Sequence, residues 1–362
     1  MKSAHRRAYI DWARGLAVLL MIEAHTTDAW TRAAAKSSIA FRNLAILGGF
    51  AAPAFLWLAG LAAVLSAART ERRTGSREVA TEALCRRGLE IFILAFLFRL
   101  QAFIVSPGSH PVTLFRVDIL NIIGPAVVAV ALIRGLGGGV VRRVWLYAAA
   151  AATIAVVTPL IRSSEAVDLL PTWLQWYVRP AGEHTTFTLF PWIGFAFAGA
   201  AVGELLASAN GDDVSERRLH ALATVVALGL IASGVYFASK PSIYRAAGFW
   251  TSSPTWFMIR TGLVTLALPA LYACANLLRS PALEAMLMPL ARLGQRSLFV
   301  YWIHVELVYG YTTWWLRGRL PVWGTLVAFA VFCAAMYGTV LARDRVVEAW
   351  RLRRLEFNPA GA

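Results

Sequence analysis

Long apolar stretches, separated by short clusters of charged residues, Pro and Gly, dominate the hydrophobic pattern of this chain. They lie at about 9–30, 44–68, 85–105, 116–134, 141–160, 187–208, 219–238, 255–278, 290–315 and 321–342. About 20 apolar residues in a helix are long enough to cross the hydrocarbon core of a bilayer. The pattern therefore predicts an all-α fold, a polytopic integral membrane bundle of about ten transmembrane helices.

No soluble segment interrupts these spans, so the sequence predicts one transmembrane domain over residues 1–362. Ten spans place both termini on the same side of the membrane. With the N-terminus in the cytoplasm, the cytoplasmic segments hold roughly twice as many Lys and Arg residues as the external ones, mainly in 68–87 and in a basic tail, 343–362. Because positive charge concentrates in cytoplasmic loops, we expect both termini to be cytoplasmic (N-in/C-in).

The composition agrees with a membrane protein. Hydrophobic residues make up 58% of the chain and charged residues 15%, whereas soluble domains average about 45–50% and about 25%. The net charge of +15 fits basic loops that contact anionic membrane lipids, and no DNA-binding motif accompanies it, so we expect no nucleic-acid partner. No His or acidic residues have the spacing of metal ligands, so no metal is expected. We expect the protein in a bacterial cytoplasmic (inner) membrane.

Ionisable side chains line one face of the first predicted helix. The positions on this face are spaced by three or four residues and comprise Asp11, Arg14, Val18, Met21, His25 and Asp28. Arg14 and His25 are eleven residues apart, which is three helical turns and about 16 Å. Because a charged side chain at the bilayer centre costs about 2.5–3.5 kcal/mol or more, this face is expected to line the bundle interior or a cavity.

A structural interpretation of the same face stays open. Asp11 and Arg14, three residues apart, can form a local ion pair near the membrane interface, and His25 can cap a helix end. Glu23 points to another side of the helix.

The first predicted helix resembles that of the transmembrane acyltransferase superfamily. In its acyltransferase-3 branch the first helix carries an Arg, ten residues and then a His, and Arg14 and His25 reproduce this spacing. Further segments resemble the branch that contains heparan-α-glucosaminide N-acetyltransferase. These are IDWARGLAVLLM, APAFLWLAG (52–60), LFRVDILNIIG (114–124), LFPWIGFAFAGAAVG (189–203) and LGQRSLFVYWIH (293–304).

The resemblance implies transfer of an acyl group, usually acetyl, from cytoplasmic acyl-CoA to an external acceptor, typically a sugar or glycan. The polar face of the first helix fits this reaction. Arg14 is expected to bind the anionic co-substrate, with Arg72 and Arg86 as further candidates that positive-inside topology explains equally well. His25 is expected to act as general base, because the ordinary pKa of a histidine is about 6.5. Asp28 is expected to orient its imidazole, and a transient acyl-histidine remains an alternative.

Other polar residues are expected at the same depth as His25. Arg116, Arg260, His304 and Glu306 are candidates for binding the acceptor or stabilising the oxyanion. The alternative is that such residues pair with one another to hold the bundle together, for example Arg260 with Asp118 or Glu306.

The main functional alternative is a secondary transporter or flippase. Such a protein also places ionisable residues within the membrane and can use them as a substrate or proton path. Transporters often contain inverted repeats, and no internal symmetry is visible here. A homodimer stays open, because nothing in the sequence decides the oligomeric state.

Overall fold

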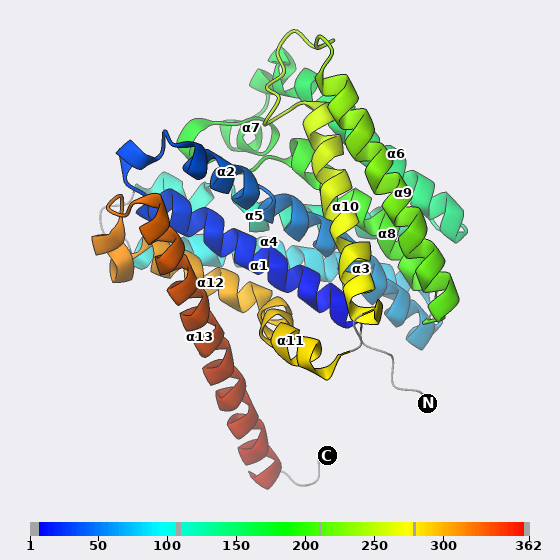
Figure 1. Cartoon of the computed structure of the whole chain (residues 1–362). Helices are drawn as coiled ribbons and strands as arrows, with labels where there is room; N and C mark the ends of the chain where they lie inside the picture. Colours follow the sequence, from blue (N-terminus) through cyan, green and yellow to red (C-terminus); the bar gives the residue numbers. More distant parts are fainter. Residues whose placement is uncertain (1–6, 106–109, 210, 278–279, 358–362) are drawn as a thin grey trace. The chain divides into compact units, whose positions relative to one another are not determined.

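The computed structural model describes residues 7–105, 110–209, 211–277 and 280–357. Within these ranges the regular structure is helical, apart from isolated bridges between Thr31 and Leu320 and between Val117 and Thr185 (Figure 1). The α-helices are α1 (Ala8–Trp30), α2 (Ile39–Gly48), α3 (Ala51–Thr74), α4 (Arg77–Val105), α5 (Ile119–Gly135), α6 (Val140–Arg162), α7 (Thr172–Val178), α8 (Leu189–Ser208), α9 (Asp213–Ala238), α10 (Pro254–Leu277), α11 (Pro281–Gln295), α12 (Ser297–Tyr309) and α13 (Val322–Phe357). Short 3-10 helices are η1 (Ala33–Ala35), η2 (Pro111–Phe115), η3 (Glu165–Leu169), η4 (Gly182–His184) and η5 (Tyr311–Leu316).

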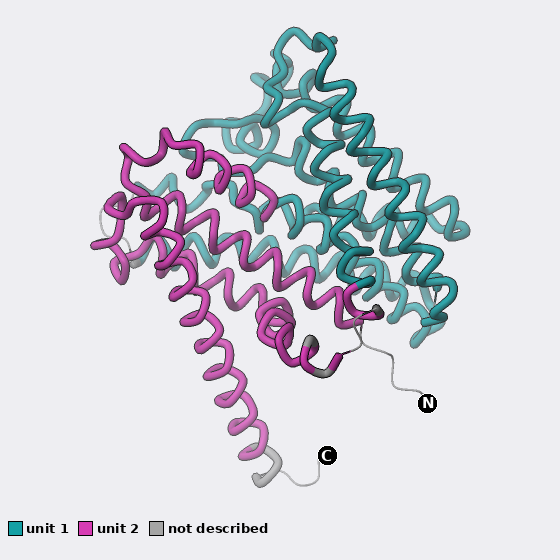
Figure 2. Tube along the Cα trace, in the orientation of Figure 1, with its two compact units in different colours: residues 1–6, 52–273 teal, residues 7–51, 274–362 magenta. Residues whose placement is uncertain are grey.

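The chain forms two compact units (Figure 2). Unit 1 contains Ala52–Ala273, and unit 2 combines Arg7–Ala51 with the C-terminal residues from Cys274 onward. Unit 2 therefore brings together the two ends of the sequence, which lie more than 200 residues apart. The prediction of one transmembrane domain over the whole chain stays a prediction.

In unit 2, α1 packs against α2, α11, α12 and α13. Two glycines let α1 and α11 approach at backbone distance. A Cβ atom at Gly15 would meet the carbonyl group of Leu290, and one at Gly294 would meet the carbonyl oxygen of Asp11. Small residues permit such close helix packing in membranes, where apolar side chains gain little by leaving lipid. These contacts fix the helix that carries the polar face.

In unit 1, glycines also mark the closest helix contacts. A Cβ at Gly60 of α3 would meet the backbone of Ala196 in α8, and one at Gly199 would meet the backbone of Trp57. The hairpin of α4 and α5 crosses at Gly88, whose added Cβ would lie 2.8 Å from the carbonyl oxygen of Gly124. Unit 1 is thus a bundle in which close small-residue crossings set the helix spacing.

Six helices in the described residues are long and apolar enough to cross a membrane. They are Ile39–Thr74, which joins α2 and α3, Val140–Arg162, Leu189–Ser208, Asp213–Ala238, Pro254–Asn276 and Val322–Arg353. An all-helical fold with six candidate membrane spans is therefore confirmed for the described residues. The number of ten spans and the N-in/C-in orientation stay predictions.

The predicted ninth span, 290–315, is wrong as a single helix. The structure ends α11 at Gln295 and starts α12 at Ser297, because Arg296 leaves the helical region with φ −111° and ψ 23°. The guanidinium Nε of Arg296 lies 2.9 Å from Oδ1 of Asp344 in α13. An ion pair between helices thus holds the residue at which the helix breaks, and a pattern of apolar residues gives no sign of it.

The predicted basic tail, 343–362, continues the last helix. α13 has 36 residues and is about 54 Å long, whereas a hydrocarbon core is about 30 Å thick. Residues 358–362 lie outside the described residues.

Candidate active site

The polar face of the first helix is carried by α1, which is one uninterrupted helix from Ala8 to Trp30. The predicted separation of Arg14 and His25, about 16 Å along the axis, therefore applies. Asp11, Val18 and Met21 on this face are buried, Arg14 and His25 are half-buried, and Asp28 is exposed. The middle of the face is thus packed with apolar side chains, while its polar groups lie toward the two ends.

At one end of this face, His25 pairs with His304 of α12. The Nδ1 atom of His25 lies 2.8 Å from Nε2 of His304. The two rings are stacked, with centroids 5.0 Å apart and an interplanar angle of 18°. His304 is fully buried, and its Nδ1 atom lies 2.9 Å from the carbonyl oxygen of Val300, one turn earlier in α12. The two histidines that were predicted separately thus form one hydrogen-bonded pair.

Asp28 lies one turn beyond His25 on α1, and other side chains engage its carboxylate. The hydroxyl of Tyr309 donates to Oδ2 of Asp28 at 3.1 Å. The Nζ atom of Lys36 lies 3.4 Å from Oδ1 and donates to the backbone oxygen of Asp28 at 2.6 Å. The ring of Tyr309 meets the His25 ring edge-on at a centroid distance of 5.6 Å. The position at Nδ1 of His25, where a triad acid would act, is held by His304.

At the other end of the face, Asp11 is linked to α11. Its Oδ2 atom accepts a hydrogen bond from Nε2 of Gln295 at 3.3 Å. The Cβ atom of Arg14 lies at the crossing of α1 and α11, 3.0 Å from the position of an added Cβ at Gly294. Arg14 is thus placed beside the α1–α11 contact, and its predicted role in binding acyl-CoA stays a prediction.

The remaining predicted site residues are spread over both units. Glu306 lies half-buried on α12 in unit 2, half a turn from His304. In unit 1, Arg116 donates from Nη2 to Oγ1 of Thr186 at 3.1 Å. Arg260 is buried in α10 with its guanidinium 4.8 Å from the centroid of the Trp256 ring. The structure therefore gives Arg116 and Arg260 partners within unit 1.

Two predicted arginines of unit 1 are exposed. Arg72 lies in the last turn of α3, and Arg86 lies in α4, 3.7 Å from Glu90 on the same helix. Asp118, named as one partner for Arg260, forms an ion pair with Arg99 of α4. Nothing in these contacts distinguishes Arg72 and Arg86 from ordinary basic residues of a loop, and their predicted role with acyl-CoA stays a prediction.

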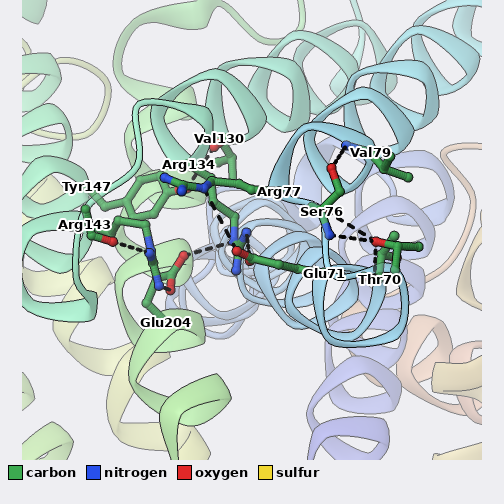
Figure 3. Close-up of polar contacts among 12 residues, drawn as sticks. Thr70, Glu71, Ser76, Arg77, Val79, Val130, Arg134, Arg143, Tyr147 and Glu204 are labelled. Atoms are coloured by element: carbon green, nitrogen blue, oxygen red, sulfur yellow. Dashed lines mark hydrogen bonds and ion pairs between the residues drawn. The ribbon is translucent and has the colours of Figure 1, made fainter.

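Sequence reasoning missed a charge cluster in unit 1 that is centred on the buried side chains of Arg134 and Glu204 and also includes Glu71, Arg77 and Arg143 (Figure 3). Nη1 of Arg134 donates a hydrogen bond to Oε2 of Glu71 at 2.7 Å, and Nε of Arg134 lies 3.1 Å from Oε1 of Glu204. Arg143 holds the other oxygen of Glu204 at 2.9 Å. Glu204 is the one charged residue of α8, LFPWIGFAFAGAAVGELLAS. An ionisable residue in such an apolar segment indicates a buried polar partner, so the sequence did contain a sign of this cluster.

Glu23 faces away from the histidine pair, as predicted. Its Oε1 atom accepts a hydrogen bond from the hydroxyl of Thr27 at 3.0 Å. Its Oε2 atom would lie 2.5 Å from a Cβ at Gly48, so the carboxyl group packs against α2. Glu23 is buried, and the close approach of its carboxyl group leaves no room for a side chain at Gly48.

Comparison of the sequence with protein families matches residues 6–241 to heparan-alpha-glucosaminide N-acetyltransferase, catalytic. A search of the curated proteins found no match. The matched range includes α1 with Arg14, His25 and Asp28, and it ends before α12 with His304. Since the match spans more than half of the chain, the protein belongs to the family of heparan-alpha-glucosaminide N-acetyltransferase catalytic domains, which are membrane acetyltransferases.

Proposed function

We propose that this protein transfers an acyl group, acetyl in the simplest case, from cytoplasmic acyl-CoA to an amine or hydroxyl of a sugar or glycan outside the cytoplasm. His25 is the general base. The observation that carries the proposal is the hydrogen bond between Nδ1 of His25 and His304. It orients the imidazole from one side and leaves Nε2 of His25 as the atom that exchanges a proton with the acceptor.

The reaction balances with one histidine. Nε2 of His25 takes the proton of the acceptor N–H or O–H while that nitrogen or oxygen attacks the thioester carbonyl. A new C–N or C–O bond forms, the tetrahedral oxyanion collapses, and the C–S bond breaks. The departing thiolate of CoA receives the proton from His25, so the free base is restored and the products are the acylated acceptor and CoA.

Arg14 supports the donor side of the proposal. Acetyltransferases of this family use acetyl-CoA or a similar donor, which combines a polyanionic nucleotide with a long thin arm. Arg14 shares a face of α1 with His25, and the separation of about 16 Å suits an extended chain between them. A guanidinium forms strong, charge-assisted hydrogen bonds to phosphate, and it also donates to amide carbonyls.

Orientation in the membrane is part of the proposal, because the donor is cytoplasmic. Fusion of a reporter that is active only outside the cytoplasm tests it. We expect a silent fusion at the C-terminus and an active fusion in the 162–186 loop. The opposite result would place His25 on the cytoplasmic side and refute transfer across the membrane.

Transfer itself is tested with purified full-length protein, acetyl-CoA labelled in the acetyl group and a panel of amino sugars and neutral glycans. We expect acceptor-dependent release of CoA and label in the acceptor. His25→Gln serves as the matched variant, because glutamine keeps hydrogen-bonding ability but cannot take up a proton at neutral pH. Transport of the glycan without release of CoA would instead support the transporter alternative.

A further inference from the structure

The hydrogen bonds around His304 form a short chain within unit 2. It runs from the carbonyl oxygen of Val300 to Nδ1 of His304 at 2.9 Å, and from Nε2 of His304 to Nδ1 of His25 at 2.8 Å. His304 has no exposed surface, so water does not compete for its two ring nitrogens. Each link therefore constrains where the hydrogens lie.

The first link fixes the hydrogen of His304. A carbonyl oxygen only accepts, so Nδ1 of His304 must carry the hydrogen that it donates to Val300. In a neutral imidazole the other nitrogen is then a bare acceptor. Nε2 of His304 therefore accepts a hydrogen bond, and its partner must be the donor.

The second link then fixes His25. Its Nδ1 atom must carry the hydrogen that Nε2 of His304 accepts. A neutral His25 has one ring hydrogen, so its Nε2 atom is left with a free lone pair. Histidine side chains in water favour the opposite tautomer, with the hydrogen on Nε2, and that tautomer cannot accept a proton at Nε2.

We propose that His304, anchored on the carbonyl of Val300, is a positioning residue that holds His25 in the tautomer with a basic Nε2 atom. This inference rests on the proposed function, in which His25 is the base. His304 takes the place that an acid occupies in a serine-protease triad, but it is neutral. The sequence predicts His304 as a candidate for binding the acceptor, whereas the present proposal gives it a role toward His25.

The other groups near the pair come from α1, from α12 and from Lys36, which follows η1. Asp28 on α1 and Tyr309 on α12 are hydrogen-bonded to each other, and Lys36 contacts the same carboxylate. The ring of Tyr301 meets His304 edge-on with centroids 5.9 Å apart. The hydrogen bonds of Asp28 and Lys36 involve the Asp28 carboxylate and backbone oxygen, not the ring nitrogens that link His25 to His304, so the tautomer follows from the chain that starts at Val300.

The tautomer is measured by ¹⁵N NMR of full-length protein in lipid, labelled at its six histidines. Ring nitrogens that carry a hydrogen have ¹⁵N chemical shifts far from those of bare ring nitrogens. The signals of each ring are assigned because they disappear in the His→Gln variant of that residue. We expect His25, under conditions in which it is neutral, to show a protonated Nδ1 and a bare Nε2. A wild-type His25 with its hydrogen on Nε2 would overturn the inference. This measurement does not depend on activity.

Kinetics of paired variants provide a second test. His304→Phe keeps an aromatic ring without an acceptor, whereas His304→Gln can place its Oε1 atom where Nε2 stood. We expect kcat to fall about 10²–10⁴-fold in His304→Phe, with KM for acetyl-CoA nearly unchanged, and to recover to within about tenfold of wild type in His304→Gln. His110→Gln, a change at an exposed histidine of unit 1, is the matched control and should behave as wild type.

Equal kcat values for His304→Phe and wild type would overturn the inference, and so would equal losses in the Phe and Gln variants. If wild-type protein transfers no acyl group to any acceptor, the proposed function fails, and the tautomer measurement still decides whether His304 sets the state of His25.

Discussion

Two buried polar centres of this protein differ in how their groups are satisfied. In unit 1, Arg134 and Arg143 pair with Glu71 and Glu204 at 2.7 to 3.1 Å, and Arg77 adds a longer ion pair to Glu71 at 3.9 Å. In unit 2, His25 and His304 form a pair that ends on a backbone carbonyl. In the charge cluster each charged side chain has a partner of opposite charge. In the histidine pair, Nε2 of His25 keeps a free lone pair.

This difference separates a structural role from a chemical one. The charge cluster connects α3, α5, α6 and α8. Removal of Glu204 takes a buried carboxylate from both Arg134 and Arg143, and breaking a buried ion pair costs about 3–5 kcal/mol. The neutral histidine pair contributes far less to stability, because a net hydrogen bond is worth about 1 kcal/mol. Burial of ionisable groups in a membrane protein is therefore by itself a weak guide to the reacting residue. The way in which each group is satisfied is more informative.

The largest effect is expected for His25→Ala. Loss of the base should lower kcat about 10²–10⁴-fold, while KM for acyl-CoA and the thermal midpoint in detergent stay close to wild type. Steady-state kinetics with a fixed acceptor measure this. A variant that keeps more than about a tenth of wild-type turnover would remove His25 from the mechanism.

Glu204→Ala should destabilise the protein by about 3–5 kcal/mol, because Arg134 and Arg143 lose a fully buried partner. Thermal unfolding in a fixed detergent measures this, with turnover counted per folded molecule. Glu71→Ala is the matched control, because the side chain of Glu71 is 32% exposed and that of Glu204 only 1%. We expect Glu71→Ala to lower the stability clearly less than Glu204→Ala does. If Glu204→Ala folds as well as wild type but is inactive, the contrast between the two centres does not hold.

Arg14→Ala is expected to affect the donor side alone. Loss of a charge-assisted hydrogen bond to acyl-CoA should cost about 1.5–3 kcal/mol, which appears as a lower kcat/KM for the donor with normal expression. Arg72→Ala, at an exposed arginine of unit 1, provides a comparison. Poor expression with unchanged binding of acetyl-CoA would favour the structural interpretation, in which Arg14 pairs with Asp11.

The smallest effect is expected for Asp28→Asn. Its exposed carboxylate interacts with Tyr309 and Lys36, and contacts of this kind are worth about 0–1 kcal/mol. Turnover should fall by less than about tenfold. A loss as large as that of His25→Ala would return Asp28 to the orienting role predicted from the sequence and weaken the case for His304.

The sequence predicted α1 well because helical periodicity is a local property. Charge spacing of three and four residues placed Arg14 and His25 on one face, and α1 is indeed continuous between them. The sequence predicts His304 as a polar residue within the membrane, but its contact with His25 joins residues 279 positions apart. Periodicity within one helix cannot predict which face of a distant helix it meets, so the pair appears only in the folded chain.

The missed features have the same cause. The helix break at Arg296 coincides with an ion pair to Asp344 of α13, and the role of Glu204 depends on arginines from α5 and α6. In each case the apolar residues around the position resemble those of an ordinary span. Both positions make long-range charge pairs in the folded chain, and hydropathy does not record such pairs.

The most direct test of the central claim is turnover per folded molecule, measured side by side for His25→Gln and Glu204→Gln with labelled acetyl-CoA and one accepted sugar. We expect that His25→Gln folds normally and loses about 10²-fold or more of its turnover. We also expect that Glu204→Gln yields less folded protein whose turnover per molecule matches wild type. The reverse pattern, with an active His25→Gln and a folded but inactive Glu204→Gln, would contradict the central claim.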